Sequence, residues 1–115
     1  MNNLTKGRQF HRESGPRTAF IKALLTALII NGKIKTTEAR AKEIRPKVEK
    51  MVTKARVKSV SNIRQIRKVL SEDVTKKLFD EISPKYENRS GGYVRITKLE
   101  RRKSDGAKLA QIEFV

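Results

Sequence analysis

Apolar residues recur at helical spacing in four segments of the chain and at alternate positions in three others. The first helical segment opens at Gly15-Pro16, where a proline in the first turn loses no hydrogen bond. It ends at Asn31-Gly32, a pair that accepts left-handed dihedral angles. Its apolar stripe covers most of the helix circumference, which predicts the central helix of the core. The stripe consists of Phe20, Ile21, Leu24, Leu25, Ala27, Leu28, Ile29 and Ile30.

A second, longer helical segment follows a threonine cap at Thr36 or Thr37, with Glu38 near its positive end. Pro46 lies inside the pattern, so the sequence predicts a kink or a break at that point. The buried stripe of this helix is expected to be Ala41, Ile44, Val48, Val52 and Ala55. Lysines and arginines occupy its other faces.

Two shorter helices are predicted next. Ser61 is expected to cap the third helix, and Ser71-Glu72-Asp73 to open the fourth, where Pro84 should stop it. Their apolar sides are predicted to be Ile63, Ile66 and Leu70 in the third helix, and Val74, Leu78 and Ile82 in the fourth.

Strands are indicated where the apolar period changes to two. Lys33 to Thr36 alternates, as do the segments that contain Val94 and Ile96 and, near the end, Ala110, Ile112 and Phe114. A basic hairpin tip with an Asp-Gly turn, residues 101–106, separates the last two strands. The pattern predicts a single two-layer α+β domain with about four helices on one face of a small, largely antiparallel sheet.

Positive charge is strong and unevenly distributed. The 115 residues include 28 Lys and Arg against 12 Asp and Glu, a net charge of +16 that favours a polyanionic partner. Residues 33–60 hold 10 basic and 3 acidic side chains, whereas residues 61–83 hold 5 and 4. The third and fourth helices are therefore expected to face away from the polyanion. Residues 1–13 are basic without any period, and we interpret them as an extension that precedes a globular domain of residues 14–115.

Other classes of function find little support. The absence of cysteine excludes disulfides, cysteine-ligated zinc and thiol catalysis. The longest apolar stretch, Ala23 to Ile30, is too short to span a membrane, and the N-terminus has no apolar signal core, so we expect a cytoplasmic protein. His11 is the only histidine, and the spacing typical of metal ligands is absent. The sequence predicts no catalysis, cofactor, metal or small-molecule substrate.

Three hypotheses remain after composition alone. The first is an RNA-binding protein of the ribosome, the second an architectural protein of the bacterial chromosome, and the third an RNA-processing enzyme. An irregular extension and a basic loop fit the uneven surface of folded RNA better than a DNA groove, where a recognition helix or paired arms are usual. The small number of acid–base groups argues against the enzyme.

Several motifs, in order along the chain, resemble those of one family. Residues 89–96, Arg-Ser-Gly-Gly-Tyr-Val-Arg-Ile, resemble the R-x-G-G-Y-x-R-I signature of bacterial large-subunit ribosomal protein seventeen. The runs that also match are Gly7-Arg8, Arg12, Arg17-Thr18-Ala19, Ile34-Lys35-Thr36-Thr37, Ala41-Lys42-Glu43-Ile44-Arg45, Lys77-Leu78-Phe79 and the closing Ala110 to Val115. Their order and spacing extend the resemblance over essentially the whole chain.

The resemblance implies a fold, a location and partners. The fold is a helix, a strand, three helices and two strands, with a small three-stranded mixed sheet in which the first strand pairs in parallel. The location is the large ribosomal subunit in the cytoplasm, near the outer region of the peptide exit tunnel. The implied partners are large-subunit ribosomal RNA and neighbouring ribosomal proteins, among them large-subunit protein thirty-two. The role is structural.

The candidate RNA-binding residues lie in the extension, around the second helix, at the glycine pair and at the hairpin tip. Gly91-Gly92 would let the backbone come close to phosphate, and Arg89 and Arg95 would grip phosphate with planar donors. Tyr93 lies opposite Val94 in the strand alternation, so its ring is expected on a polar or RNA-facing surface, where it could stack on a base. The full set is Lys6, Arg8, His11, Arg12, Arg17, Lys35, Arg40, Lys42, Arg45, Arg89, Ser90, Gly91, Gly92, Tyr93, Arg95, Arg101, Arg102 and Lys103.

Overall fold

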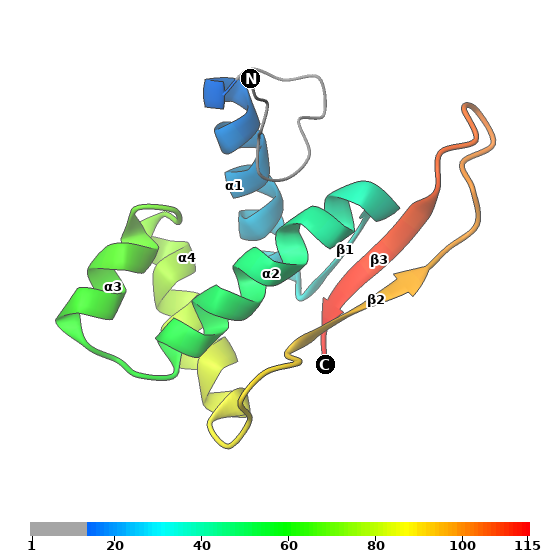
Figure 1. Ribbon diagram of the computed structural model, residues 1–115. Coiled ribbons are helices and arrows are strands. Elements are labelled where there is room, and N and C mark those ends of the chain that lie inside the picture. The colour runs from blue at the N-terminus through cyan, green and yellow to red at the C-terminus, as the bar shows by residue number, and fades with distance from the viewer. Residues whose placement is uncertain (1–13) are drawn as a thin grey trace, which may run out of the picture.

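Four α-helices and a three-stranded sheet make up the part of the chain that the computed structural model describes, residues 14–115, with side chains from residue 17 onward (Figure 1). In chain order the elements are α1 (Ser14–Asn31), β1 (Lys33–Thr37), α2 (Glu38–Ala55), α3 (Val60–Arg67), α4 (Glu72–Lys77), a π-helical turn η1 (Leu78–Ile82), a 3-10 turn η2 (Ser83–Tyr86), β2 (Val94–Lys98) and β3 (Leu109–Phe114). The α+β class and the element order predicted from the sequence are confirmed.

Helix α2 begins at the expected cap and passes through its proline without a break. The Thr37 hydroxyl accepts a hydrogen bond from the backbone N–H of Arg40, at 3.3 Å. Pro46 lies in the middle of the helix, yet the helix is continuous to Ala55, so the predicted break is wrong. Proline removes one backbone hydrogen bond there, and the fully buried Ile44 and Val48 hold the helix against the sheet on either side of it.

The third and fourth helices differ from prediction at their ends. Ser59, rather than Ser61, caps α3 and accepts from the N–H of Asn62 at 3.1 Å. Ser71 precedes α4 but forms no side-chain cap, and its carbonyl instead accepts from the Thr75 hydroxyl at 2.8 Å. The helical path then continues past Pro84 to Tyr86, because a 3-10 turn accepts proline in its first turn.

The sheet has the strand order β1-β3-β2, and both pairings are antiparallel. The expectation of a mixed sheet with a parallel first strand is therefore wrong, and the largely antiparallel sheet expected from the pattern is right. One row of partners, Ile34, Ile112 and Ile96, runs across all three strands on the face that packs against α2. The chain between β2 and β3 projects beyond the sheet as a hairpin (Figure 1).

One core joins the two layers. Its fully buried side chains come from α1, α2, η1, β3 and the residue before β2: Leu28, Ile44, Val52, Leu78, Tyr93 and Ile112 are each 0 % exposed. Helix α1 contributes less than its wide stripe predicted, since Phe20 and Leu24 are only half-buried and Ile30 is 48 % exposed. No helix in residues 14–115 is long and apolar enough to cross a membrane.

Candidate nucleic-acid interface

The acidic side chains of α2 are all used within the protein. Glu38 accepts from Lys42 at 2.9 Å, and this hydrogen bond lowers the pKa of Glu38 below its ordinary value. Glu43 is buried and pairs with Arg17 of α1, at 3.1 Å between Nη2 and Oε1. Glu49 accepts from the backbone N–H groups of residues 93 and 94, at 3.2 and 3.1 Å. Internal bonding therefore reduces the negative charge that α2 offers to solvent.

Several cations of the same helix remain in solvent. Arg45, Lys47 and Lys50 are exposed, and within the described part of the chain they form no ion pair or hydrogen bond. Lys42 is exposed as well and keeps its i,i+4 pair with Glu38. An anion that approaches α2 thus meets unneutralised positive charge, and the nearest carboxylates are already engaged. This is the property required of a phosphate-binding surface.

Two of the predicted RNA-contact residues, Arg17 and Arg40, form contacts within the protein that the sequence did not predict. Arg17 is half-buried and bound to Glu43. The Arg40 guanidinium lies 4.6 Å from the centre of the Phe20 ring, a cation–π contact that joins α2 to α1. Both arginines therefore tie α1 and α2 together, and their contact with RNA stays a prediction.

The outer face of the sheet, on the side away from α2, carries a second group of cations. Lys33, Glu113 and Arg95 form one row across the three strands, and Lys35 lies in the next row beside Gln111. Arg95 Nε pairs with Glu113 at 3.3 Å on the surface, where such a pair contributes little to stability. Lys35 and Arg95 thus lie on the opposite side of the sheet from the cations of α2, so the predicted residues do not form one cluster.

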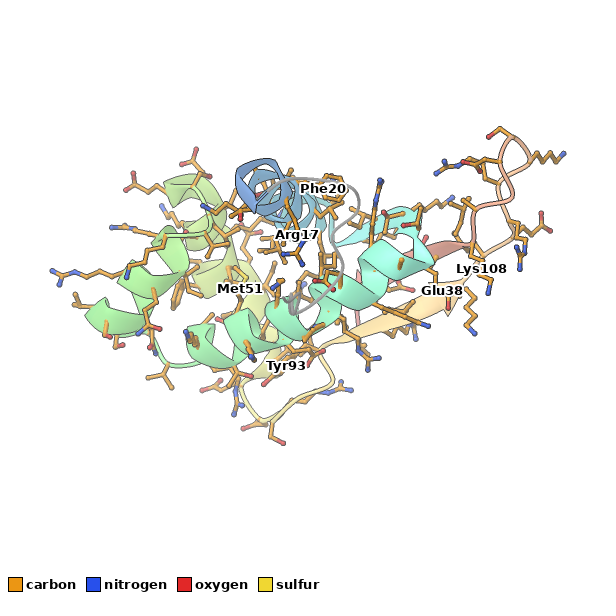
Figure 2. All side chains as sticks on the ribbon, turned by 45° about the horizontal axis from the view of Figure 1, so that its top comes forward. Arg17, Phe20, Glu38, Met51, Tyr93 and Lys108 are labelled. Atoms are coloured by element: carbon orange, nitrogen blue, oxygen red, sulfur yellow. The ribbon has the colours of Figure 1, made fainter. Side chains whose placement is uncertain are left out.

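The hairpin tip has the turn that the sequence predicted. Gly106 adopts a φ of +71°, and Asp105 accepts from the N–H of Ala107 at 3.1 Å. The other Asp105 oxygen pairs with Arg102 at 3.2 Å, while Arg101 donates to the Gly106 carbonyl. These bonds fix the loop. Figure 2 shows its side chains projecting into solvent, and Lys103 is exposed among them without a partner in the described residues.

The segment around the glycine pair is an exposed turn. Gly92 has a φ of +65°, a conformation that favours glycine, whereas Gly91 has no such requirement. Arg89 Nε donates to the Gly91 carbonyl at 3.2 Å, which folds the arginine back over the turn. Ser90 is exposed beside it. The backbone of this turn is accessible to phosphate, but only one of the two glycines is conformationally necessary.

Tyr93 does not lie on the surface, so the predicted base-stacking position is wrong. Its side chain is 0 % exposed and its ring packs edge-on against Tyr86, with 5.2 Å between the ring centres. Its hydroxyl contacts Thr53 Oγ1 and Arg56 Nη1, both at 3.2 Å, and donates to the Arg89 carbonyl at 3.1 Å. Figure 2 shows it directly beside α2. Tyr93 therefore anchors the glycine turn to α2 from the inside.

Sequence reasoning missed Glu49 and Arg56, the two α2 residues that complete this anchor. Glu49 binds the backbone N–H groups that open β2, and Arg56 Nη2 donates to the Glu87 carbonyl at 3.1 Å. A lone acid on a basic helix face was the only available signal for Glu49. Nothing in the local pattern distinguished Arg56 from its exposed neighbours.

Some predicted features lie outside this surface. Lys6, Arg8, His11 and Arg12 precede the residues that the structure describes. Around α3 and α4, cations pair with acids: Arg67 of α3 pairs with Glu72 of α4 at 3.6 Å, and Lys58, which precedes α3, pairs with Asp80 of η1 at 3.5 Å. In residues 14–115 no group of three His, Cys, Asp or Glu side chains is placed to hold a metal ion.

Comparison with known proteins gives one consistent result. Residues 20–115 match the model of the family described as ribosomal protein L17. The chain is 45 % identical to large ribosomal subunit protein bL17 of Gemmatimonas aurantiaca, over 100 % of this chain and 98 % of that protein. It is 49 % identical to the bL17 of Thermoanaerobacter sp. strain X514 and 43 % identical to that of Clostridium acetobutylicum, each over 94 % of this chain and 97 % and 96 % of the relatives.

Proposed function

This chain belongs to the ribosomal protein L17 family, and from that premise we propose that it binds large-subunit ribosomal RNA and stabilises the fold of that RNA. As a member of that family it is a structural constituent of the large ribosomal subunit, in the cytoplasm, and not an enzyme.

The engagement of the α2 carboxylates is the observation that carries the proposal. Glu38, Glu43 and Glu49 are each bonded to a cation or to backbone N–H groups of the same chain. Exposed cations of that helix therefore meet phosphate without competition from neighbouring acids. Release of counterions from neutralised phosphates then supplies a salt-dependent affinity.

The distribution of the cations favours folded RNA over duplex DNA. Arg45 on α2, Arg95 on the outer sheet face and Lys103 at the hairpin tip lie on different sides of the domain. A single duplex groove would contact one side at a time, whereas folded ribosomal RNA can surround a small domain. Residues 1–13 are proposed as a further RNA-binding extension of the domain formed by residues 14–115.

Neighbouring ribosomal proteins complete the proposed environment, and the resemblance to the family adds large-subunit protein thirty-two to them. Val57 in the turn between α2 and α3 and Val60 at the start of α3 are 62 % and 66 % exposed, next to the nearly neutral helices. Exposed apolar side chains there suit a protein neighbour better than RNA phosphate.

Cosedimentation tests the assignment to the subunit. Tagged full-length chain in a lysate at low magnesium should travel with large subunits, and it should stay with them after DNase treatment. A chain that sediments with the chromosome would instead support the architectural DNA-binding alternative.

A matched pair of variants tests RNA binding directly. Arg45→Gln with Lys103→Gln removes one arginine and one lysine from the proposed surface. Arg64→Gln with Lys68→Gln removes the same charges from α3 and the residue that follows it. The first double variant should lower the salt slope of ribosomal RNA binding by roughly one for each lost phosphate contact. Equal losses in both double variants would show that only total charge matters, and would contradict the proposed surface.

A further inference from the structure

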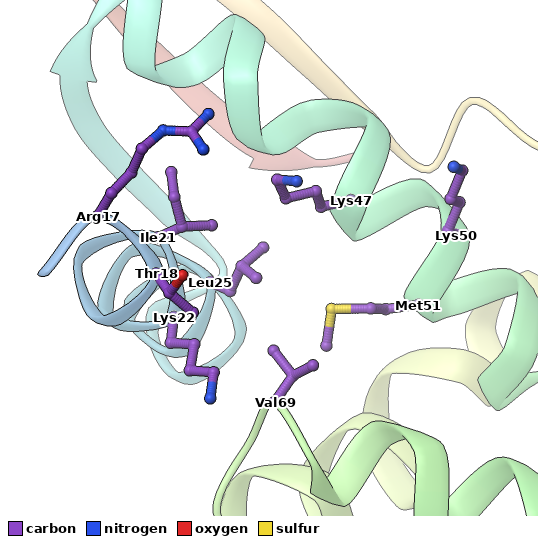
Figure 3. Close-up of a pocket in the computed structure, with 9 residues that line it drawn as sticks. All are labelled: Arg17, Thr18, Ile21, Lys22, Leu25, Lys47, Lys50, Met51 and Val69. Atoms are coloured by element: carbon purple, nitrogen blue, oxygen red, sulfur yellow. The ribbon is translucent and has the colours of Figure 1, made fainter. Parts of the chain in front are cut away.

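A cavity of about 390 Å³ lies between α1, α2 and the segment that joins α3 to α4 (Figure 3). Its apolar wall consists of Ile21 and Leu25 from α1, Met51 from α2 and Val69 from the joining segment, and Figure 3 shows these side chains facing the same space. The volume lies within the range of about 300 to 1,000 Å³ that is typical of small-molecule sites. One planar ring system fits such a space.

Four cations surround the apolar wall. Arg17 and Lys22 come from α1, Lys47 and Lys50 come from α2, and no acidic residue lines the cavity. Within the described residues, Lys22, Lys47 and Lys50 form no ion pair, while Arg17 is held by Glu43. Cations gathered around one opening repel each other, and a bound anion relieves that repulsion.

An apolar wall with a cationic rim selects a ligand with a flat, weakly hydrated body and negative groups beside it. A nucleotide has this chemistry, because its base has apolar faces and its phosphates flank the sugar. The Met51 thioether suits the wall, since it is flexible and makes favourable contacts with aromatic rings. Each nucleotide within an RNA chain has a phosphate on either side, so the two phosphates can contact the rim cations of α1 and α2 at the same time.

We infer that this cavity receives one unstacked nucleobase of the bound ribosomal RNA, while the adjoining phosphates contact the rim cations. The inference rests on the proposed function, since it names the part of the RNA that this surface takes. Sequence-specific RNA contact commonly uses such unstacked bases, and stacking or burial of one base contributes about 1 to 3 kcal/mol.

Two other occupants fit less well. Residues 1–13 carry three cations and one acid, so their charge repels the rim. An acidic, apolar segment of a neighbouring ribosomal protein would match the rim, but the unneutralised cations elsewhere on α2 continue the same positive surface toward RNA. The experiment below therefore also detects such a protein segment in the cavity.

Crosslinking with the full chain tests the inference. The protein is assembled with large-subunit ribosomal RNA that contains 4-thiouridine or, in a second preparation, 6-thioguanosine, and the complex is irradiated. Mass spectrometry should find a crosslink to Met51 or Val69 that involves one RNA position. In complete large subunits, a chain that carries a photoreactive diazirine analogue of methionine in place of Met51 detects a protein neighbour in the cavity instead.

Two tryptophan variants supply the matched comparison. Val69→Trp fills the cavity, and Ser61→Trp adds the same ring at an exposed position outside it. The natural chain has no tryptophan, so a blue-shifted emission from Val69→Trp verifies that the ring is buried. Val69→Trp should lose the crosslink and bind ribosomal RNA about ten-fold more weakly, within the range expected for one stacked base. Ser61→Trp should do neither.

The outcomes separate the inference from the proposed function. If the natural chain binds ribosomal RNA but crosslinks only outside the cavity, or Val69→Trp binds as tightly as the natural chain, the inference is wrong and the proposed function stands. A crosslink from the cavity to another ribosomal protein also overturns the inference. If the natural chain does not bind ribosomal RNA, the proposed function fails. Should Val69→Trp unfold, Thr18→Trp at the exposed rim closes the same opening and decides the question.

Discussion

Replacing Tyr93 with phenylalanine removes a single hydroxyl from a fully buried ring. That hydroxyl contacts Thr53 and Arg56 and donates to the carbonyl of Arg89. The ring itself and its packing against Tyr86 stay in place. The variant therefore isolates the hydrogen bonds that attach the glycine turn to α2.

The expected loss follows from which partners are left unsatisfied. Thr53 is exposed, so water replaces the phenol oxygen at little cost. The Arg56 Nη1 and the Arg89 carbonyl are partly buried, and the Nε of Arg56 already lacks a partner. A buried polar group that loses its partner costs about 1 to 3 kcal/mol, so we expect Tyr93→Phe to lower the free energy of unfolding by about 2 kcal/mol. For a domain of this size the melting temperature should fall by about 10 °C.

Thermal and urea unfolding measure this loss, with Tyr86→Phe as the matched control. The Tyr86 hydroxyl donates to one acceptor, the Val115 oxygen, at 2.7 Å. Its removal should cost about 1 kcal/mol, roughly half the loss at Tyr93. At low temperature, where both variants remain folded, RNA affinity should change little in either one, because neither ring is available to stack on a base.

The reasoning would be refuted by an unchanged melting temperature for Tyr93→Phe. It would also be refuted if Tyr93→Leu lost RNA affinity while its stability matched that of Tyr93→Phe. Either result would favour the RNA-facing position of the Tyr93 ring that the strand alternation predicted.

Three further predictions concern RNA binding. The affinity of the full chain for ribosomal RNA should fall with salt with a slope magnitude of about 5 or more, since several surfaces neutralise phosphates; a flat titration would contradict this. Deletion of residues 1–13 should leave the melting temperature nearly unchanged but lower RNA affinity and incorporation into large subunits, and unfolding of the truncated chain would show that the segment belongs to the core. Arg89→Gln with Arg95→Gln should weaken RNA binding by about 1 to 3 kcal/mol without loss of fold. Competition with the natural chain for assembly into subunits measures the loss, and equal incorporation of the two chains would indicate that the RNA contact lies on α2 and the extension instead.

Features with a local cause were predictable from the sequence. The Thr37 cap, the Asp105-Gly106 turn and the alternation around Ile112 depend on residues within a few positions of each other, and the structure has all three. The failures involve distant partners. Tyr93 precedes the first residue of β2, so the alternation did not apply to it, and partners from α2 determine its orientation.

The sequence predicted which kinds of residue make up the candidate site but not how they are arranged in space. The excess of cations on α2 was visible in the sequence, whereas the bonds that engage its three acids join residues up to 45 positions apart. The sequence likewise gave no indication that Lys35 and Arg95 lie on the opposite side of the sheet from α2. A helix with a central proline was expected to kink or break; it does not break, because tertiary packing of the neighbouring residues prevailed over that local preference.

Engagement of the α2 carboxylates has a thermodynamic consequence. In the unfolded chain Glu38, Glu43 and Glu49 are free to repel phosphate, while folding ties them to internal partners. The proposed RNA ligand should therefore bind the folded chain more tightly than the unfolded one. By mass action, any ligand with that preference raises the melting temperature in proportion to the logarithm of its concentration above Kd. The RNA that the protein is proposed to stabilise would in return act as a folding cofactor for the protein.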